Sequence, residues 1–127
     1  MSEHYIWQDG QVIPVDAMTW AEWFRVADRH VALTTFGDVD GHEVHVSTVF
    51  LGLDYTFSCD PHLAVLWETM VFGLPTWHPL GDYQERYSSR EDAEGGHAEL
   101  CSALAGMLNR PGETLPFADW HARHASP

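Results

Sequence analysis

The chain has 127 residues, 45% of them hydrophobic, and this length and composition predict one folded domain and not a disordered chain. Nineteen acidic residues outnumber six basic ones, all of them arginine, so the formal net charge is −13. This balance argues against a nucleic-acid binder, which needs a basic surface. It favours a solvated acidic surface, a cationic partner or mimicry of a polyanion.

The N-terminal residues predict a hairpin. Two short apolar runs, at 5–7 and 12–15, flank the dipeptide Asp9-Gly10. Asp-Gly between two such runs is a strong signal for a two-residue hairpin turn. Because Pro14 has no backbone N–H to donate, the second strand should lie at a sheet edge.

A helix is expected next, from a cap at Asp16 to about Arg29. Apolar side chains recur within it at helical spacing, which predicts one face packed in the core, with an interaction face as the alternative. The side chains of this stripe are Trp20, Trp23, Phe24 and Ala27.

Residues 31–36 predict a strand, closed by a turn at 37–41. Asp38 and Asp40 in this turn resemble the start of a calcium loop. The later ligands and the terminal glutamate of such a loop are missing at the required spacing, so no calcium site is predicted.

The centre of the chain predicts a long antiparallel hairpin. Two runs rich in β-branched and aromatic residues, at 44–53 and 63–72, flank a turn-rich segment at 54–62. Neither run alternates cleanly between apolar and polar residues. Both faces of the sheet should therefore be covered, one by helices and the other by a partner or a second layer.

Residues 73–86 predict an irregular loop, followed by a second long helix that runs to about Asn109. Ser88 and Glu91 fit the capping-box pattern at the start of this helix. Gly95-Gly96 costs about 1 kcal/mol per residue relative to alanine, which indicates a kink or the close approach of another backbone. The apolar stripe of this helix is Ala93, His97, Leu100, Cys101, Leu104, Met107 and Leu108.

The predicted fold class is α+β, with a mostly antiparallel sheet of four or five strands packed with two main α-helices. Residues 1–110 form the single predicted domain. Residues 111–127 are a Pro-bounded C-terminal tail with one short amphipathic piece at 117–121.

No motif predicts catalysis, a metal or a cofactor. His42-x-x-His45 falls in a predicted strand, where this spacing places the two rings on opposite faces. His97 falls on an apolar stripe, where a hydrogen-bonded core histidine is the usual explanation. Cys59 and Cys101 lack metal-like spacing and fit reduced thiols in a cytoplasm, with a disulfide between them left open. No apolar run is long enough to cross a membrane.

Glu68 interrupts the second apolar run, where an unpaired carboxylate is expensive to bury. If the hairpin closes symmetrically, Glu68 falls opposite Ser47 or Thr48, and Arg86 or Arg90 is available as an ionic partner. The open alternatives are a buried structural ion pair, a polar anchor in a ligand pocket and a general base.

A second candidate site lies at the start of the second helix. Arg86 and Arg90 flank this point, where the helix adds partial positive charge, so we expect both to face a common cleft with Tyr87 and to favour an anion. Trp77 is a candidate for stacking on a base. Neutralisation of neighbouring acids is the alternative role of the two arginines.

Several strings resemble a family of small uncharacterised proteins from bacteriophages and actinobacterial genomes, and the likeness covers roughly residues 5–105. They are MTWAEWFRVADRHVALT, VSTVFLGLDYTF, LWETMVFG and RYSSREDAEGGHAE. His45 and residues 59–62 depart from the family pattern. The family likeness carries no activity of its own. Phage association, small size, acidic charge and the lack of a catalytic motif are similar to what counter-defence proteins show, and by this analogy we expect a non-enzymatic protein in the host cytoplasm that sequesters a small nucleotide-like ligand.

Two alternatives to this function remain: an acidic inhibitor that binds a basic site on a host protein as DNA mimics do, and a minor phage structural or assembly protein. Direct nucleic-acid or membrane binding is not expected. Two apolar helix stripes and a two-sided hairpin predict a homodimer or a higher oligomer.

Overall fold

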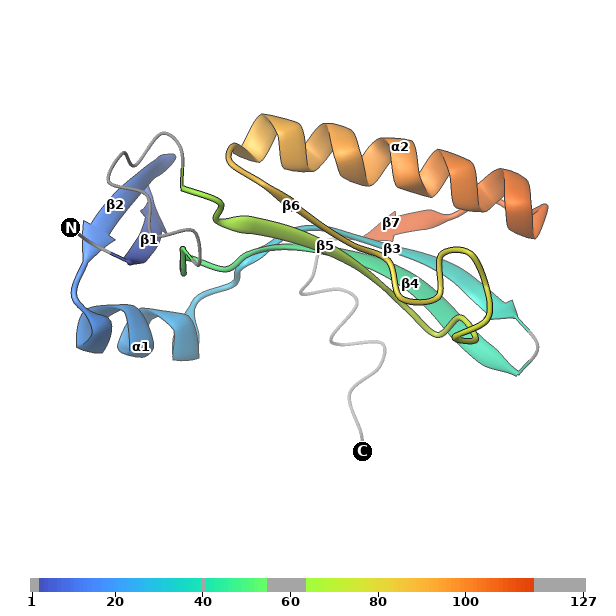
Figure 1. The fold of residues 1–127 in the computed structure, drawn as a ribbon, viewed down its shortest axis with the longest axis horizontal. Helices are drawn as coiled ribbons and strands as arrows, with labels where there is room; N and C mark the ends of the chain where they lie inside the picture. The colour runs from blue at the N-terminus through green and yellow to red at the C-terminus, as the bar shows by residue number, and fades with distance from the viewer. Residues whose placement is uncertain (1–2, 40, 55–63, 116–127) are drawn as a thin grey trace.

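A five-stranded antiparallel sheet carries one long helix on one face, as the expected α+β fold requires (Figure 1). The computed structural model describes residues 3–39, 41–54 and 64–115. No helix in these ranges has the length and hydropathy needed to cross a membrane. The sheet order is β6-β5-β4-β3-β7. In chain order the elements are β1 (His4–Gln8), β2 (Gln11–Val15), α1 (Ala17–Val26), β3 (His30–Val39), β4 (His42–Phe50), β5 (Trp67–Phe72), β6 (Gln84–Tyr87), α2 (Arg90–Leu108) and β7 (Glu113–Leu115).

The N-terminal hairpin, β1–β2, lies at one end of the large sheet together with α1 (Figure 1). Asp9 and Gly10 both have positive φ, at 53° and 75°, as the predicted two-residue turn requires. Asp16 caps α1 by accepting a hydrogen bond from the Thr19 N–H at 2.7 Å.

The aromatic stripe of α1 is less buried than predicted. No residue of α1 is fully buried, and the helix ends at Val26, before the expected Arg29. This helix packs beside β1 and not across a sheet face, so only part of each ring is covered. Trp23 reaches the core by packing edge-on against Phe50, with ring centroids 5.6 Å apart.

The central hairpin is confirmed as β4–β5, but Glu68 lies opposite Val49 and not opposite Ser47 or Thr48. Phe50 pairs with Trp67 and Thr48 with Thr69, so the pairing is centred between residues 58 and 59, one residue later than a closure around 54–61 would give.

Two short strands come from segments that were not expected to join the sheet. Residues 84–86, predicted as part of a loop, lie in β6, which pairs with β5. Residues 113–115, from the predicted tail, form β7 and pair with β3. The predicted amphipathic piece at 117–121 and Cys59 lie outside the described residues. Among the described elements, α2 covers one face of the sheet, and none packs across the other.

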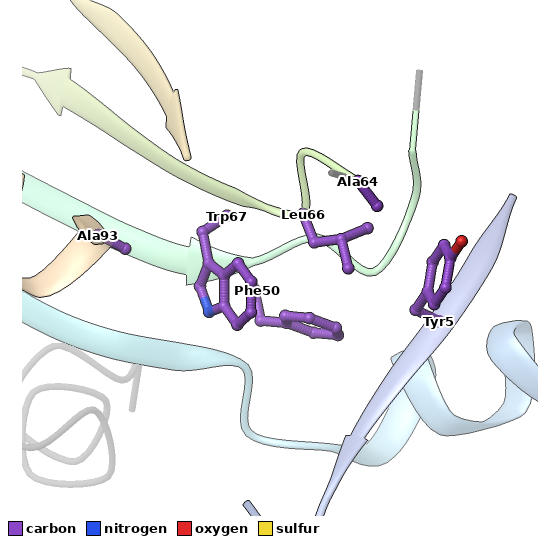
Figure 2. Packing of buried hydrophobic residues seen from close by; sticks show 6 residues of the cluster. All are labelled: Tyr5, Phe50, Ala64, Leu66, Trp67 and Ala93. Atoms are coloured by element: carbon purple, nitrogen blue, oxygen red, sulfur yellow. The ribbon is translucent and has the colours of Figure 1, made fainter. Parts of the chain in front are cut away.

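Two apolar clusters form the core between the sheet, α2 and the N-terminal hairpin. The first, shown in Figure 2, joins the hairpin to the end of the sheet. The second lies under the C-terminal half of α2. The first cluster consists of Tyr5, Phe50, Ala64, Leu66, Trp67 and Ala93, and the second of Phe36, Val44, Val46, Val71, Leu100 and Leu104.

A chain of hydrogen-bonded polar side chains, all buried except Thr114 at its end, separates the two clusters. His97 on α2 contacts Thr48 Oγ1 through Nδ1 at 2.7 Å and Thr34 Oγ1 through Nε2 at 2.8 Å. Thr48 continues to Thr69 at 2.5 Å, and Thr34 to Thr114 of β7 at 2.6 Å. Neutral imidazole has one donor and one acceptor, so one of Thr34 and Thr48 donates to the ring and the other accepts from it. His97 is therefore the hydrogen-bonded core histidine that its place on the stripe predicted.

Helix α2 begins one residue later than predicted, because Ser89 and not Ser88 is its cap. The Asp92 N–H donates to Ser89 Oγ at 3.0 Å. Asn109 ends the helix with a left-handed φ of 53°. The two glycines of the pair Gly95-Gly96 have different surroundings. Gly95 faces open space, whereas a Cβ at Gly96 would overlap the phenol ring of Tyr87. A side chain and not a backbone therefore makes the close approach.

The two glycines should respond oppositely to alanine. Gly95→Ala should raise the free energy of unfolding by about 1 kcal/mol, the difference in helix propensity. Gly96→Ala gains the same propensity but displaces Tyr87, so it should lower the free energy of unfolding by about 1–3 kcal/mol. Urea denaturation of both variants measures this, and equal stabilisation would show that Tyr87 does not pack against α2.

His97 should make stability depend on pH. Burial lowers the pKa of its imidazole below the usual 6.5, so the unfolded chain binds the proton more readily than the fold. The stabilisation is complete above about pH 6.5 and is lost as the pH falls toward the folded pKa, at up to about 1.4 kcal/mol per pH unit. Urea denaturation at several pH values should show this slope, and His97→Gln should remove it while lowering stability at neutral pH.

Candidate functional site

The structure does not bring the predicted anion-binding residues into one cleft. Adjacent residues of a strand point to opposite faces, so Arg86 lies on the face away from α2, while Tyr87 lies against Gly96 of α2. Arg90 lies at the start of α2. Trp77 is 79% exposed in the loop before β6. Arg86, Tyr87 and Arg90 could share one site only if the segment before the helix were an irregular loop, as predicted from the sequence. It is the regular strand β6 instead.

Glu68 has its partners on the neighbouring strand β6. Arg86 Nε donates to Glu68 Oε2 at 2.9 Å, and the Gln84 amide donates to the same oxygen. Glu68 is 8% exposed, whereas the Arg86 side chain is 40% exposed. Thr48 instead belongs to the core beside His97, and Ser47 lies opposite Met70. Glu68 therefore links β5 to β6, and neither Ser47 nor Thr48 lies opposite it.

A pocket of about 520 Å³ lies between the N-terminal hairpin and the start of α2. Its walls combine two indoles with polar groups from the helix start. We call it the hairpin–α2 pocket. It is lined by Trp7, Gly10, Gln11, Val12, Trp67, Ser88, Ser89, Arg90 and Glu91.

The aromatic wall of this pocket is rigid on its inner side. Trp67 is 2% exposed and packs edge-on against Trp7, with ring centroids 5.7 Å apart. Trp7 is only half-buried, so part of its indole faces the pocket. Trp67 Nε1 has no hydrogen-bond partner among the described residues, which is costly for a buried N–H.

Arg90 supplies the positive charge of the hairpin–α2 pocket. Its guanidinium carbon lies 5.5 Å from the Trp7 ring centroid, and its Nε donates to Glu94 at 2.9 Å. A guanidinium has five N–H groups, so this ion pair leaves donors for a ligand. The first amides of α2 add partial positive charge, although Glu91 at the rim offsets part of it.

The sequence indicated Arg90 as a candidate but gave no signal for Trp7 and Trp67. The sequence does predict both the hairpin turn and the start of the helix. Neither prediction shows that these two features lie next to each other in the fold. Within the described ranges, no group of three or more His, Cys, Asp and Glu side chains is arranged to hold a metal ion.

Comparison with protein-family models, with curated proteins and with solved structures gives no match to this chain. The geometry of the pocket is therefore the basis for assigning a function.

Glu68→Gln should lower the free energy of unfolding by about 1–2 kcal/mol. This is less than the loss from breaking a fully buried ion pair, because Arg86 is partly solvated. The variant should leave ligand binding in the hairpin–α2 pocket unchanged, because Glu68 does not line it. Thermal denaturation measures the first effect. A melting temperature equal to that of the wild type would refute the structural role.

Proposed function

We propose that this protein binds a small nucleotide-like ligand in the hairpin–α2 pocket without changing it chemically. The supporting observation is the combination of an exposed indole surface, at Trp7, with the Arg90 guanidinium at the start of a helix. Indoles stack on planar rings, and guanidinium groups and helix starts bind phosphate or carboxylate. A planar ring that carries an anionic group satisfies both.

The charge of the pocket favours a ligand with few negative charges. Among the described residues, Arg90 is the only arginine that lines it, and Glu91 lies at its rim. The net charge of −13 further opposes a polyphosphate. A nucleoside monophosphate or a cyclic mononucleotide fits these limits, whereas a nucleoside triphosphate would face repulsion from the chain.

The absence of a chemical step is part of the proposal. Ligand binding without turnover would serve sequestration, the counter-defence role that phage association, small size and acidic charge suggest by analogy. Among the described residues the pocket brings one carboxylate, Glu91, close to the ligand, and this side chain is exposed.

A thermal-shift comparison of nucleosides, nucleoside monophosphates and cyclic mononucleotides tests this function. A ligand at about 100 times its Kd should stabilise the protein by about 2.7 kcal/mol and raise its melting temperature by several degrees. Mass spectrometry should recover the ligand unchanged. If no member of the panel raises the melting temperature, the proposal is wrong, and a converted ligand would indicate an enzyme.

Arg90→Gln tests the pocket itself. It should abolish the preference for the nucleotide over its nucleoside, because it removes the guanidinium but leaves the aromatic wall. Its cost in stability should be small, about 0.3–0.5 kcal/mol for the Glu94 pair. Arg25→Gln, at an exposed position on α1, is the matched control and should bind as the wild type does. Equal loss of binding in both variants would place the ligand elsewhere.

A further inference from the structure

A second concave surface runs along the other side of α2, between this helix and β6 with the loop before it. Its volume is about 460 Å³. We call it the α2–β6 groove. The residues that line it include Tyr83, Glu85, Tyr87, Glu99, Leu100 and Met107. It shares no lining residue with the hairpin–α2 pocket.

Within the described ranges, the ionisable groups that line this groove are two carboxylates and two phenols, and no arginine lines it. The Tyr83 hydroxyl lies 3.4 Å from Glu85 Oε2. Burial raises the pKa of the Tyr83 phenol, and the charges of Glu85 and Glu99 contribute to the rise, so the four groups share one small region. A positive charge placed there would be close to both carboxylates.

The remainder of the groove is apolar. Leu100 is buried at its base, and Met107 is 54% exposed although its side chain is large and apolar. Tyr87 packs against Gly96, where the missing Cβ lets the phenol ring line the groove. A long cationic side chain suits this combination, because its hydrocarbon stem covers apolar surface while its charged end meets carboxylates and ring faces.

The charge of α2 extends beyond the groove. The helix carries Glu91, Asp92, Glu94 and Glu99 against one arginine, Arg90, which pairs with Glu94. With a net charge of −13 for the chain, this helix would attract a basic partner over a distance and repel a second copy of itself.

We propose that the α2–β6 groove is a docking site for a basic segment of another protein, which inserts lysine or arginine side chains between Glu85 and Glu99. Charge complementarity selects this occupant over an acidic or apolar one. The groove admits one or two side chains, so the segment is short or extended and does not bring a folded surface into the groove. This interaction is independent of the small-ligand pocket.

Fluorescence anisotropy with the full-length protein tests the docking site. The probe is a labelled peptide of repeating Gly-Ser-Lys, and its control has Gln in place of each Lys. The Lys peptide should bind at low salt and weaken steeply as salt rises, while the Gln peptide should not bind. Equal binding of both peptides would overturn the proposal, and so would spermine binding as tightly as the Lys peptide, because the site would then serve free amines.

Two variants of equal charge locate the binding. Glu85→Gln combined with Glu99→Gln should weaken the Lys peptide by about tenfold or more. Glu3→Gln combined with Glu22→Gln removes the same charge from exposed positions away from the groove and should change the affinity less than about twofold. If the two double variants weaken binding equally, the overall field and not the groove attracts the peptide, and the proposal is wrong.

Discussion

The hydrogen-bonded contact between His97 and the threonines of the sheet fixes how α2 lies on this fold. On α2, β4 and β5 alike, one polar residue separates the residues of the two apolar clusters. Sliding the helix by one turn would bury His97 among hydrocarbon side chains and remove the hydrogen bonds that Thr34 and Thr48 make to its imidazole. An unsatisfied buried polar group loses more free energy than a hydrogen bond gains. The hydrogen bonds of His97 therefore disfavour wrong positions of α2 more than they stabilise the right one.

Both small-molecule and protein recognition depend on that position of α2. Its first turn forms one wall of the hairpin–α2 pocket, and its later turns form one side of the α2–β6 groove. Tyr87 marks the division, since it lies under Gly96 in the groove and is followed directly by Ser88 in the pocket. The two surfaces are therefore held by one rigid helix, whose placement the histidine sets.

The scarcity of cations limits what the surface can do. Arg86 is paired with Glu68 and Arg90 with Glu94, so the arginines that made an anion site plausible are already partly neutralised. Arg90 retains a functional role because it also borders an aromatic pocket, whereas Arg86 lies on the opposite face. Among the described residues, the other acids of α2, Glu91, Asp92 and Glu99, form no ion pair, and this asymmetry favours cationic partners along most of the helix.

Local signals in the sequence determined the elements that rest on local physics: the Asp9-Gly10 turn, the Asp16 cap, the two central strands and the extent of α2. Pairing between distant segments decided the rest. Strands β6 and β7 are too short to be recognised without the neighbours that complete their hydrogen bonds, and the position of Glu68 followed from the fit of buried side chains across β4 and β5. Helical spacing from His97 to Met107 did mark the α2 edge of the groove, whereas the β6 edge was predicted as part of a loop. The spacing did not show that these edges face each other, because which strand packs beneath which helix face is a property of the folded chain alone.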